Sequence, residues 1–185
     1  MRARAVIAYQ DQQSYQDRFS QDKTTLYGIV EADLTNNTLL TVAIDNQKTT
    51  PTGTMSGGLP IFYNDGSRTN YDRETSTATS WSSSTTNALN SFISVDHNFN
   101  ANWQLSASYI YGNNDLEYDV FWATGHSDAQ TNIGMTPGSL NFIDAKRIQR
   151  TYEIELTGRF NWLEQSHQVM FGYNSQEQDF ATPYF

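Results

Sequence analysis

The chain has 185 residues, a formal net charge of −9 and no cysteine. Disulfides and thiolate metal sites are therefore excluded, and the acidic balance argues against nucleic-acid binding, which needs a basic surface. Hydrophobic residues make up only 37% of the sequence while aromatic residues make up 14%. This balance suits a transmembrane β-barrel, in which every second strand residue faces water. The sequence has no run of ~18 apolar residues, so it predicts no membrane-spanning helix.

The first part of the chain predicts three short strands. Residues 4–10 and 25–34 alternate between apolar and polar side chains, and the polar residues 11–22 between them predict a loop. Residues 35–38 predict a tight turn, after which the alternation continues over residues 40–44. A period of two residues is typical of a strand with two different faces.

Residues 88–112 show the clearest pattern, which predicts a strand, an Asn-rich turn at 98–102 and a second strand. Five residues of the second strand share one face: Trp103, Leu105, Ala107, Tyr109 and Tyr111. Aromatic residues at both ends of this face, with small or aliphatic residues between them, are typical of a strand that crosses a bilayer.

Two stretches lose the alternation and predict long loops, at about residues 47–86 and 113–147. Alternation returns in residues 151–162 and again in 168–174, with a short turn at 163–166 between them. Short turns therefore alternate with long connections along about seven strands. Outer-membrane barrels show this asymmetry, with short periplasmic turns and long extracellular loops.

The predicted fold class is all-β, an antiparallel up-and-down transmembrane β-barrel. Single-chain bacterial barrels have an even number of strands, so about seven strands predict a segment of a larger barrel. The start of the sequence does not read as a signal peptide, although an outer-membrane protein must be exported, so we expect an internal piece of a longer chain. We predict that eight residues face lipid: Leu89, Ile93, Val95, Leu105, Ala107, Ile154, Leu156 and Phe171. A periplasmic aromatic girdle is predicted from Phe99, Trp103, Phe160 and Trp162.

Catalytic signals are weak. His97 and His167 lie at or beside predicted turns, whereas His126 lies in a long loop at the opposite end, so we expect no metal site. Glu153 and Glu155 lie two residues apart, which is compatible with acid–base chemistry but more typical of solvated charges on a barrel wall. We therefore predict that the protein is not an enzyme and has no cofactor.

The first long loop contains four aromatic residues whose exposure to water would be unfavourable: Phe62, Tyr63, Tyr71 and Trp81. Two arginines, Arg68 and Arg73, lie between them in the sequence. Aromatic side chains with a few cations are able to bind a planar or anionic ligand. The alternative interpretation is that these rings fold the loop onto itself. Phe121 and Trp122 in the second long loop are a weaker case of the same kind.

Six stretches resemble the TonB-dependent outer-membrane receptors for ferric siderophores, in particular the ferric-pyoverdine and ferric-coprogen type: residues 4–11, 27–34, 58–68, 81–83, 92–99 and 165–169. The resemblance spans nearly the whole chain. It implies a location in the outer membrane of a Gram-negative bacterium and a 22-stranded barrel with an N-terminal plug domain. It also implies a ferric siderophore as the transported ligand, and uptake driven by the TonB complex, which pulls on a short N-terminal box.

By the same resemblance, residues 1–185 would supply roughly the first third of the barrel, without the plug or the box. The family binds siderophores with aromatic residues of the loops and the plug. The implied candidates in this chain are Tyr63, Tyr71, Trp81 and Trp122. Two other interpretations stay open at this point: a soluble β-sandwich that binds a ligand or carbohydrate, and a small complete structural barrel of about eight strands.

Overall fold

The structure is a computed structural model that describes residues 1–138 and 141–182. One antiparallel sheet contains seven strands in the order β1-β2-β3-β4-β5-β8-β9. Their bounds are Arg2–Gln13 (β1), Ser20–Thr35 (β2), Thr38–Thr52 (β3), Ser83–Asn100 (β4), Trp103–Val120 (β5), Asn141–Trp162 (β8) and Gln165–Ala181 (β9). A separate two-stranded ribbon joins β6 (Ala123–Thr124) and β7 (Thr136–Pro137).

Within the described ranges, no helix is long and apolar enough to cross a membrane.

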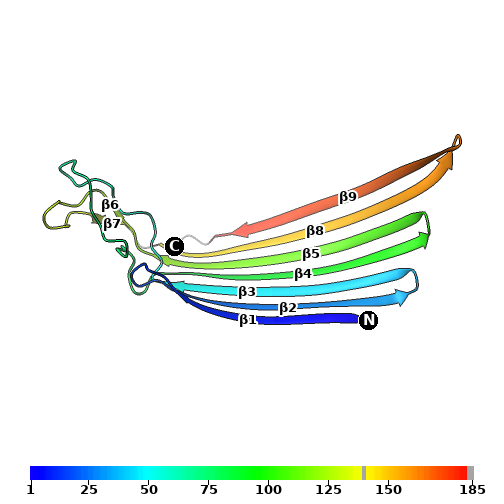
Figure 1. The fold of residues 1–185 in the computed structure, drawn as a ribbon, viewed down its shortest axis with the longest axis horizontal. Coiled ribbons are helices and arrows are strands. Elements are labelled where there is room, and N and C mark those ends of the chain that lie inside the picture. The colour runs from blue at the N-terminus through cyan, green and yellow to red at the C-terminus, as the bar shows by residue number, and fades with distance from the viewer. Residues whose placement is uncertain (139–140, 183–185) are drawn as a thin grey trace.

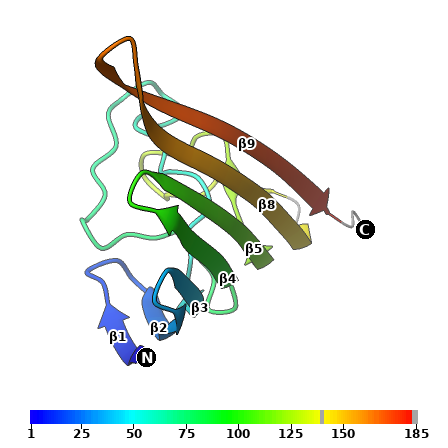
Figure 2. The same cartoon turned by 90° about the vertical axis from the view of Figure 1, so that its right-hand side faces the viewer.

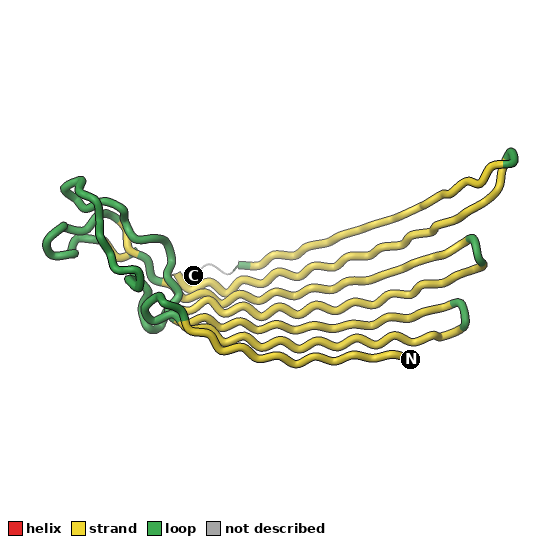
Figure 3. Tube along the Cα trace, viewed as in Figure 1, coloured by secondary structure: helices red, strands yellow, loops and turns green. Residues whose placement is uncertain are grey.

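Strands that follow one another in the sheet also follow one another in the chain, apart from the small β6–β7 ribbon, so the prediction of an up-and-down order is confirmed. The tight turns that join β2 to β3, β4 to β5 and β8 to β9 lie at one end of the sheet (Figure 1). All of the long irregular connections lie at the other end (Figure 3). The sheet therefore has a turn end and a loop end, as the alternating connection lengths predicted.

The sheet is open and bends into an arc (Figure 2). Within the described residues, β1 pairs only with β2, β9 pairs only with β8, and the two edge strands do not contact each other. The described part of the chain thus forms no closed small barrel. It also contains no second large sheet packed against the first, which excludes the two-sheet core that a β-sandwich requires.

One face of the sheet is apolar across all seven strands. Residues directly opposite each other in an antiparallel pair point to the same side of the sheet. One such row contains Ala3, Val30, Val42, Ile93, Tyr109 and Tyr152. The eight residues predicted to face lipid all belong to this face, and nothing in the described chain covers it: Ile154 is 50% exposed and Phe171 is 62% exposed.

The opposite face is polar and bonded across strands. Ser106 donates to the carboxylate of Asp96, and the amide of Asn174 donates to Glu153 at 2.7 Å. Glu153 and Glu155 both lie on this face, as predicted. Because charged groups must stay hydrated or paired, this face suits a water-filled lumen.

The four predicted girdle residues gather at the turn end of the sheet. The ring of Trp103 lies over Gly158, where a Cβ atom would come within 2.4 Å of the ring. The imidazole of His167 stacks on Phe160 with ring centroids 5.5 Å apart, and Trp162 lies 6.1 Å from the same imidazole. Phe99 meets His97 edge-on at 4.7 Å.

The strands are longer than the sequence predicted, and the loops are correspondingly shorter. The expected loop at residues 11–22 is reduced to 14–19, and the one at 47–86 to 53–82. The one at 113–147 begins only at residue 121, and strand resumes at Asn141. A strand needs only ~9–11 residues to cross a bilayer. Beyond the bilayer both faces meet water, so the alternation of side chains is lost while the backbone pairing continues.

Candidate ligand-binding loops

Three connections form the loop end of the molecule. We call them the first loop (residues 14–19), the second loop (53–82) and the third loop (described over 121–138). The hydroxyl of Tyr118, on the polar face of β5, donates to Ser56 of the second loop at 3.4 Å. The second loop therefore meets the sheet on its polar face at this point.

A tight hairpin forms the tip of the second loop. Phe62 and Arg68 form a β-bridge, and the amide of Tyr63 donates to the carbonyl of Ser67 at 2.8 Å. Gly66 has a φ of 84°, a conformation that favours glycine. The carboxylate of Asp65 accepts from the hydroxyl and the amide of Ser67, and these bonds lower the pKa of Asp65.

Two of the four predicted ligand-binding residues come together at this tip. The rings of Tyr63 and Tyr71 have centroids 6.3 Å apart and are tilted by 58°, and both residues are half-buried. Arg68 in the same hairpin is exposed. Tilted rings at this distance form a favourable aromatic pair. The tip thus presents aromatic and cationic surface together.

Trp81 and Trp122 lie in other surroundings. Trp81 is 49% exposed and directly precedes Ser82, a fully buried residue whose hydroxyl donates to the carbonyls of Thr54 and Thr79. Trp122 is half-buried and packs against Gly138, whose added Cβ would lie 2.0 Å from the indole nitrogen. Among the described residues, ring contacts join Tyr63 to Tyr71 but join neither of them to Trp81 or Trp122.

The third loop braces the tip of the second loop through Ser127, a residue that sequence reasoning missed. Ser127 is 1% exposed, and its hydroxyl shares a hydrogen bond with the hydroxyl of Tyr71 at 3.0 Å. Its carbonyl accepts from the amide of Asn64 at 2.9 Å, and Nδ1 of His126 donates to the carbonyl of Phe62 at 2.9 Å. No local sequence pattern marks a serine that bonds a tyrosine 56 residues earlier.

Asp128 organises the turn that follows Ser127. Its carboxylate accepts from the amides of Gln130 and Thr131 and from the hydroxyl of Thr131, each at 3.0 Å. These bonds, the Gln130 amide first, lower the pKa of Asp128. An ionised Asp128 therefore holds the third loop in shape at neutral pH.

The first loop braces the other half of the second loop. The guanidinium of Arg18 donates to the carbonyl of Ala78 at 2.7 Å, and the amide of Asp17 donates to that of Glu74 at 2.9 Å. The guanidinium of Arg73 lies 4.3 Å from the centre of the Tyr15 ring. Arg73, which the sequence offered as a ligand-binding cation, is thus engaged within the protein.

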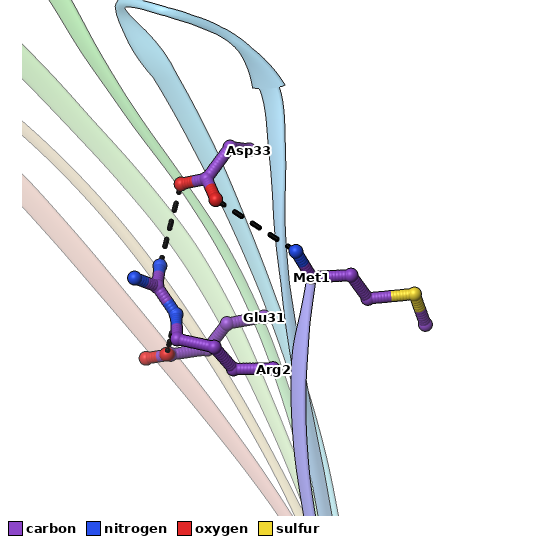
Figure 4. Close-up of polar contacts among 4 residues, drawn as sticks. All are labelled: Met1, Arg2, Glu31 and Asp33. Carbon is purple, nitrogen blue, oxygen red and sulfur yellow. Dashed lines mark hydrogen bonds and ion pairs between the residues drawn. The ribbon is translucent and has the colours of Figure 1, made fainter.

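A group of ion pairs at the start of the chain lies away from the loops. On the polar face near the turn end, Arg2 bonds Glu31 at 3.0 Å and Asp33 at 3.3 Å, and the amino group of Met1 lies 3.9 Å from Asp33 (Figure 4). In the part of the chain that the structure describes, no three histidine or acidic side chains are close enough together to hold a metal ion.

The chain was compared with known proteins in both sequence and structure. No protein-family model matches the chain. A ferric-pyoverdine 358 receptor of Pseudomonas putida is 31% identical over 97% of this chain, which spans 22% of that receptor's length. The crystal structure of the ferripyoverdine receptor of the outer membrane of Pseudomonas aeruginosa, bound to ferripyoverdine, matches with a TM-score of 0.88 and 28% identity. That match covers 96% of this chain and 24% of the receptor chain.

The chain is homologous to the ferric-pyoverdine receptors.

This homology confirms the resemblance inferred from the sequence and the prediction of a partial outer-membrane barrel. The homologues are receptors, which confirms the prediction that the protein is not an enzyme. The ferric-catecholate import receptor Fiu of E. coli shares the fold alone, with a TM-score of 0.76 at 15% identity over 95% of this chain and 27% of Fiu. The homology to ferric-pyoverdine receptors and the single open sheet together disfavour the soluble sandwich.

Proposed function

We propose that this chain supplies a stretch of barrel wall and three surface loops to an outer-membrane receptor that takes up ferric siderophores. The observation that supports this most strongly is the match of the whole sheet, with a TM-score of 0.88, to a receptor whose structure contains ferripyoverdine. The apolar face, the opposite polar face and the long loops gathered at one end of the sheet all suit such a receptor.

The two open edges support a larger barrel. Unpaired backbone N–H and C=O groups are too costly in a bilayer, so β1 and β9 need further strands beside them. We propose that residues 1–185 are one part of a barrel of about 22 strands, the number implied by the family resemblance. The same proposal places a plug domain, and the region that engages the energy-transducing TonB complex, outside this sequence.

We propose that the ferric siderophore binds at the loop end, where Tyr63, Tyr71, Trp81 and Trp122 are the candidate contacts. The paired rings of Tyr63 and Tyr71 support this assignment best, because aromatic faces stack on planar groups. Arg68, which is exposed in the same hairpin, supplies a cation that attracts anions. Trp81 also offers exposed indole surface, whereas Trp122 is largely engaged with Gly138.

The test uses the full-length receptor that contains this sequence, with ferripyoverdine as the probe. Replacing Tyr63 or Tyr71 by Ala removes one aromatic contact and is expected to raise the Kd by about two- to tenfold. Ile133→Ala is the matched control, because Ile133 is exposed in the third loop. Uptake of radioactive iron as ferripyoverdine measures transport, and no uptake by the unmodified receptor would refute the proposed function for this ligand.

A further inference from the structure

The second loop is held from both sides. The first loop bonds residues 74 and 78 in the later half of the second loop, whereas the third loop bonds the hairpin tip at residues 62, 64 and 71. The second loop is therefore held in place by both neighbouring loops as well as by its own internal hydrogen bonds.

Ser127 is the centre of the contact between the second and third loops. It bonds Tyr71 through its hydroxyl and Asn64 through its carbonyl, and it is almost completely buried. The adjacent bond from His126 to Phe62 adds a third link. These three hydrogen bonds approach the hairpin from the side of the third loop and hold both of its arms.

The third loop is built to serve as a rigid support. The β6–β7 ribbon closes its base by pairing Ala123 with Pro137. Asp128, next to Ser127, fixes the following turn through three hydrogen bonds, and its own amide donates to the carbonyl of Ile133 at 2.8 Å. A support that is stiff by itself is able to impose its position on the hairpin that it contacts.

We propose that Ser127 is a positioning residue that locks the third loop onto the second and thereby sets the place of the Tyr63–Tyr71 ring pair. Neither the sequence pattern nor the names of the relatives assign this role. The contact between the loops stands on geometry alone, whereas its effect on siderophore affinity rests on the proposed function. Ligand binding at the tyrosines then depends on the third loop, whose hydrogen bond to Tyr71 is made by Ser127.

The experiment is a double-mutant cycle in the full-length receptor, with Ser127→Ala, Tyr71→Phe and the two together. Tyr71→Phe keeps the ring and removes only the hydroxyl that meets Ser127. Each single variant is expected to weaken ferripyoverdine binding by about two- to tenfold, as the loss of one hydrogen bond does. The double variant is expected to be no weaker than the single variants, because both remove the same bond. Ser80→Ala, at an exposed serine of the second loop, is the matched control and leaves the Kd unchanged.

A second measurement is made without ligand, so that the contact between the loops is tested separately from its effect on ligand binding. Hydrogen exchange of the Asn64 amide, which donates to Ser127, is expected to become several-fold faster in Ser127→Ala and in Tyr71→Phe. Unchanged exchange in both variants overturns the proposal. Faster exchange with an unchanged Kd supports the contact between the loops, refutes its role in binding and counts against binding at the tyrosines. Unchanged exchange with additive losses of affinity means that Ser127 touches the ligand itself, which also overturns the positioning role.

Discussion

Replacing Ile154 by Arg tests the lipid-facing side of the sheet at its most sensitive point. Ile154 pairs with Ala107, which lies midway along β5 between the aromatic residues Trp103 and Tyr111. The rise per residue of a strand places Trp103 and Tyr111 each ~13 Å from Ala107 along β5. With a strand tilt of ~45°, this corresponds to ~9 Å along the bilayer normal. Ile154 therefore lies near the bilayer midplane, where Arg costs ~2–4 kcal/mol.

The matched control is Thr157→Arg in the same strand. Thr157 lies on the polar face, opposite Gln104 and Met170, so its replacement is expected to change the free energy of unfolding by less than ~1 kcal/mol. Urea unfolding of the full-length receptor in phospholipid vesicles, followed by the change of its mobility in a gel, measures both values. Equal losses for the two variants would refute the assignment of the two faces.

Three further outcomes follow from named contacts. Gly158→Val forces a side chain into the ring of Trp103 and is expected to lower the free energy of unfolding by ~1–3 kcal/mol in the same assay. Gly172→Ala has room for its methyl group and should change this free energy little. An unchanged stability in Gly158→Val would show that the Trp103 ring is free to move. Because the pKa of Asp128 is lowered in the folded protein, its ionised carboxylate stabilises the turn at pH values above ~3.9, the ordinary aspartate pKa. This stabilisation is lost as the pH falls through the lower pKa of the folded state. The protection factors of the third-loop amides, which compare each exchange rate with that of an unstructured peptide at the same pH, should therefore fall on acidification, and Asp128→Asn should abolish this pH dependence. Arg2→Gln removes exposed ion pairs and is expected to cost under ~1 kcal/mol, with the difference vanishing in high salt; a larger or salt-independent cost would mean that the pairs are shielded from solvent.

The middle of each strand was predictable because two solvents act on it. Hydrocarbon selects apolar residues such as Leu105 and Ile154, while water on the other side admits Ser106 and Glu155, and the period of two follows directly. Two of the three tight turns were predictable for a related reason, since the asparagines at 36–37 and 98–102 favour reversal of the chain. The third turn, at Leu163 and Glu164, was predictable only from the short gap between two alternating segments.

The strand ends and the loop contacts were not predictable in this way. Residues such as Lys48 and Asp119 extend their strands beyond the apolar zone, where either face accepts polar side chains and only the backbone bonds define the structure. At the loop end, the aromatic residues of the second loop stood out, but the pairing of Tyr63 with Tyr71 depends on a hairpin tip. Ser127 is one serine among many, and its importance arises only from its position in space.

A nitroxide scan of residues 103–112 tests the central claim most directly. Because the sequence contains no cysteine, one labelled cysteine at a time is readily introduced into this segment of the full-length receptor. In bilayers, we expect accessibility to dissolved oxygen to be highest at odd positions such as Leu105 and Ala107. Accessibility to a water-soluble nickel complex should be highest at even positions such as Ser106 and Ser108. A flat profile, or one with the two reagents interchanged, would contradict a sheet with lipid on one side and water on the other.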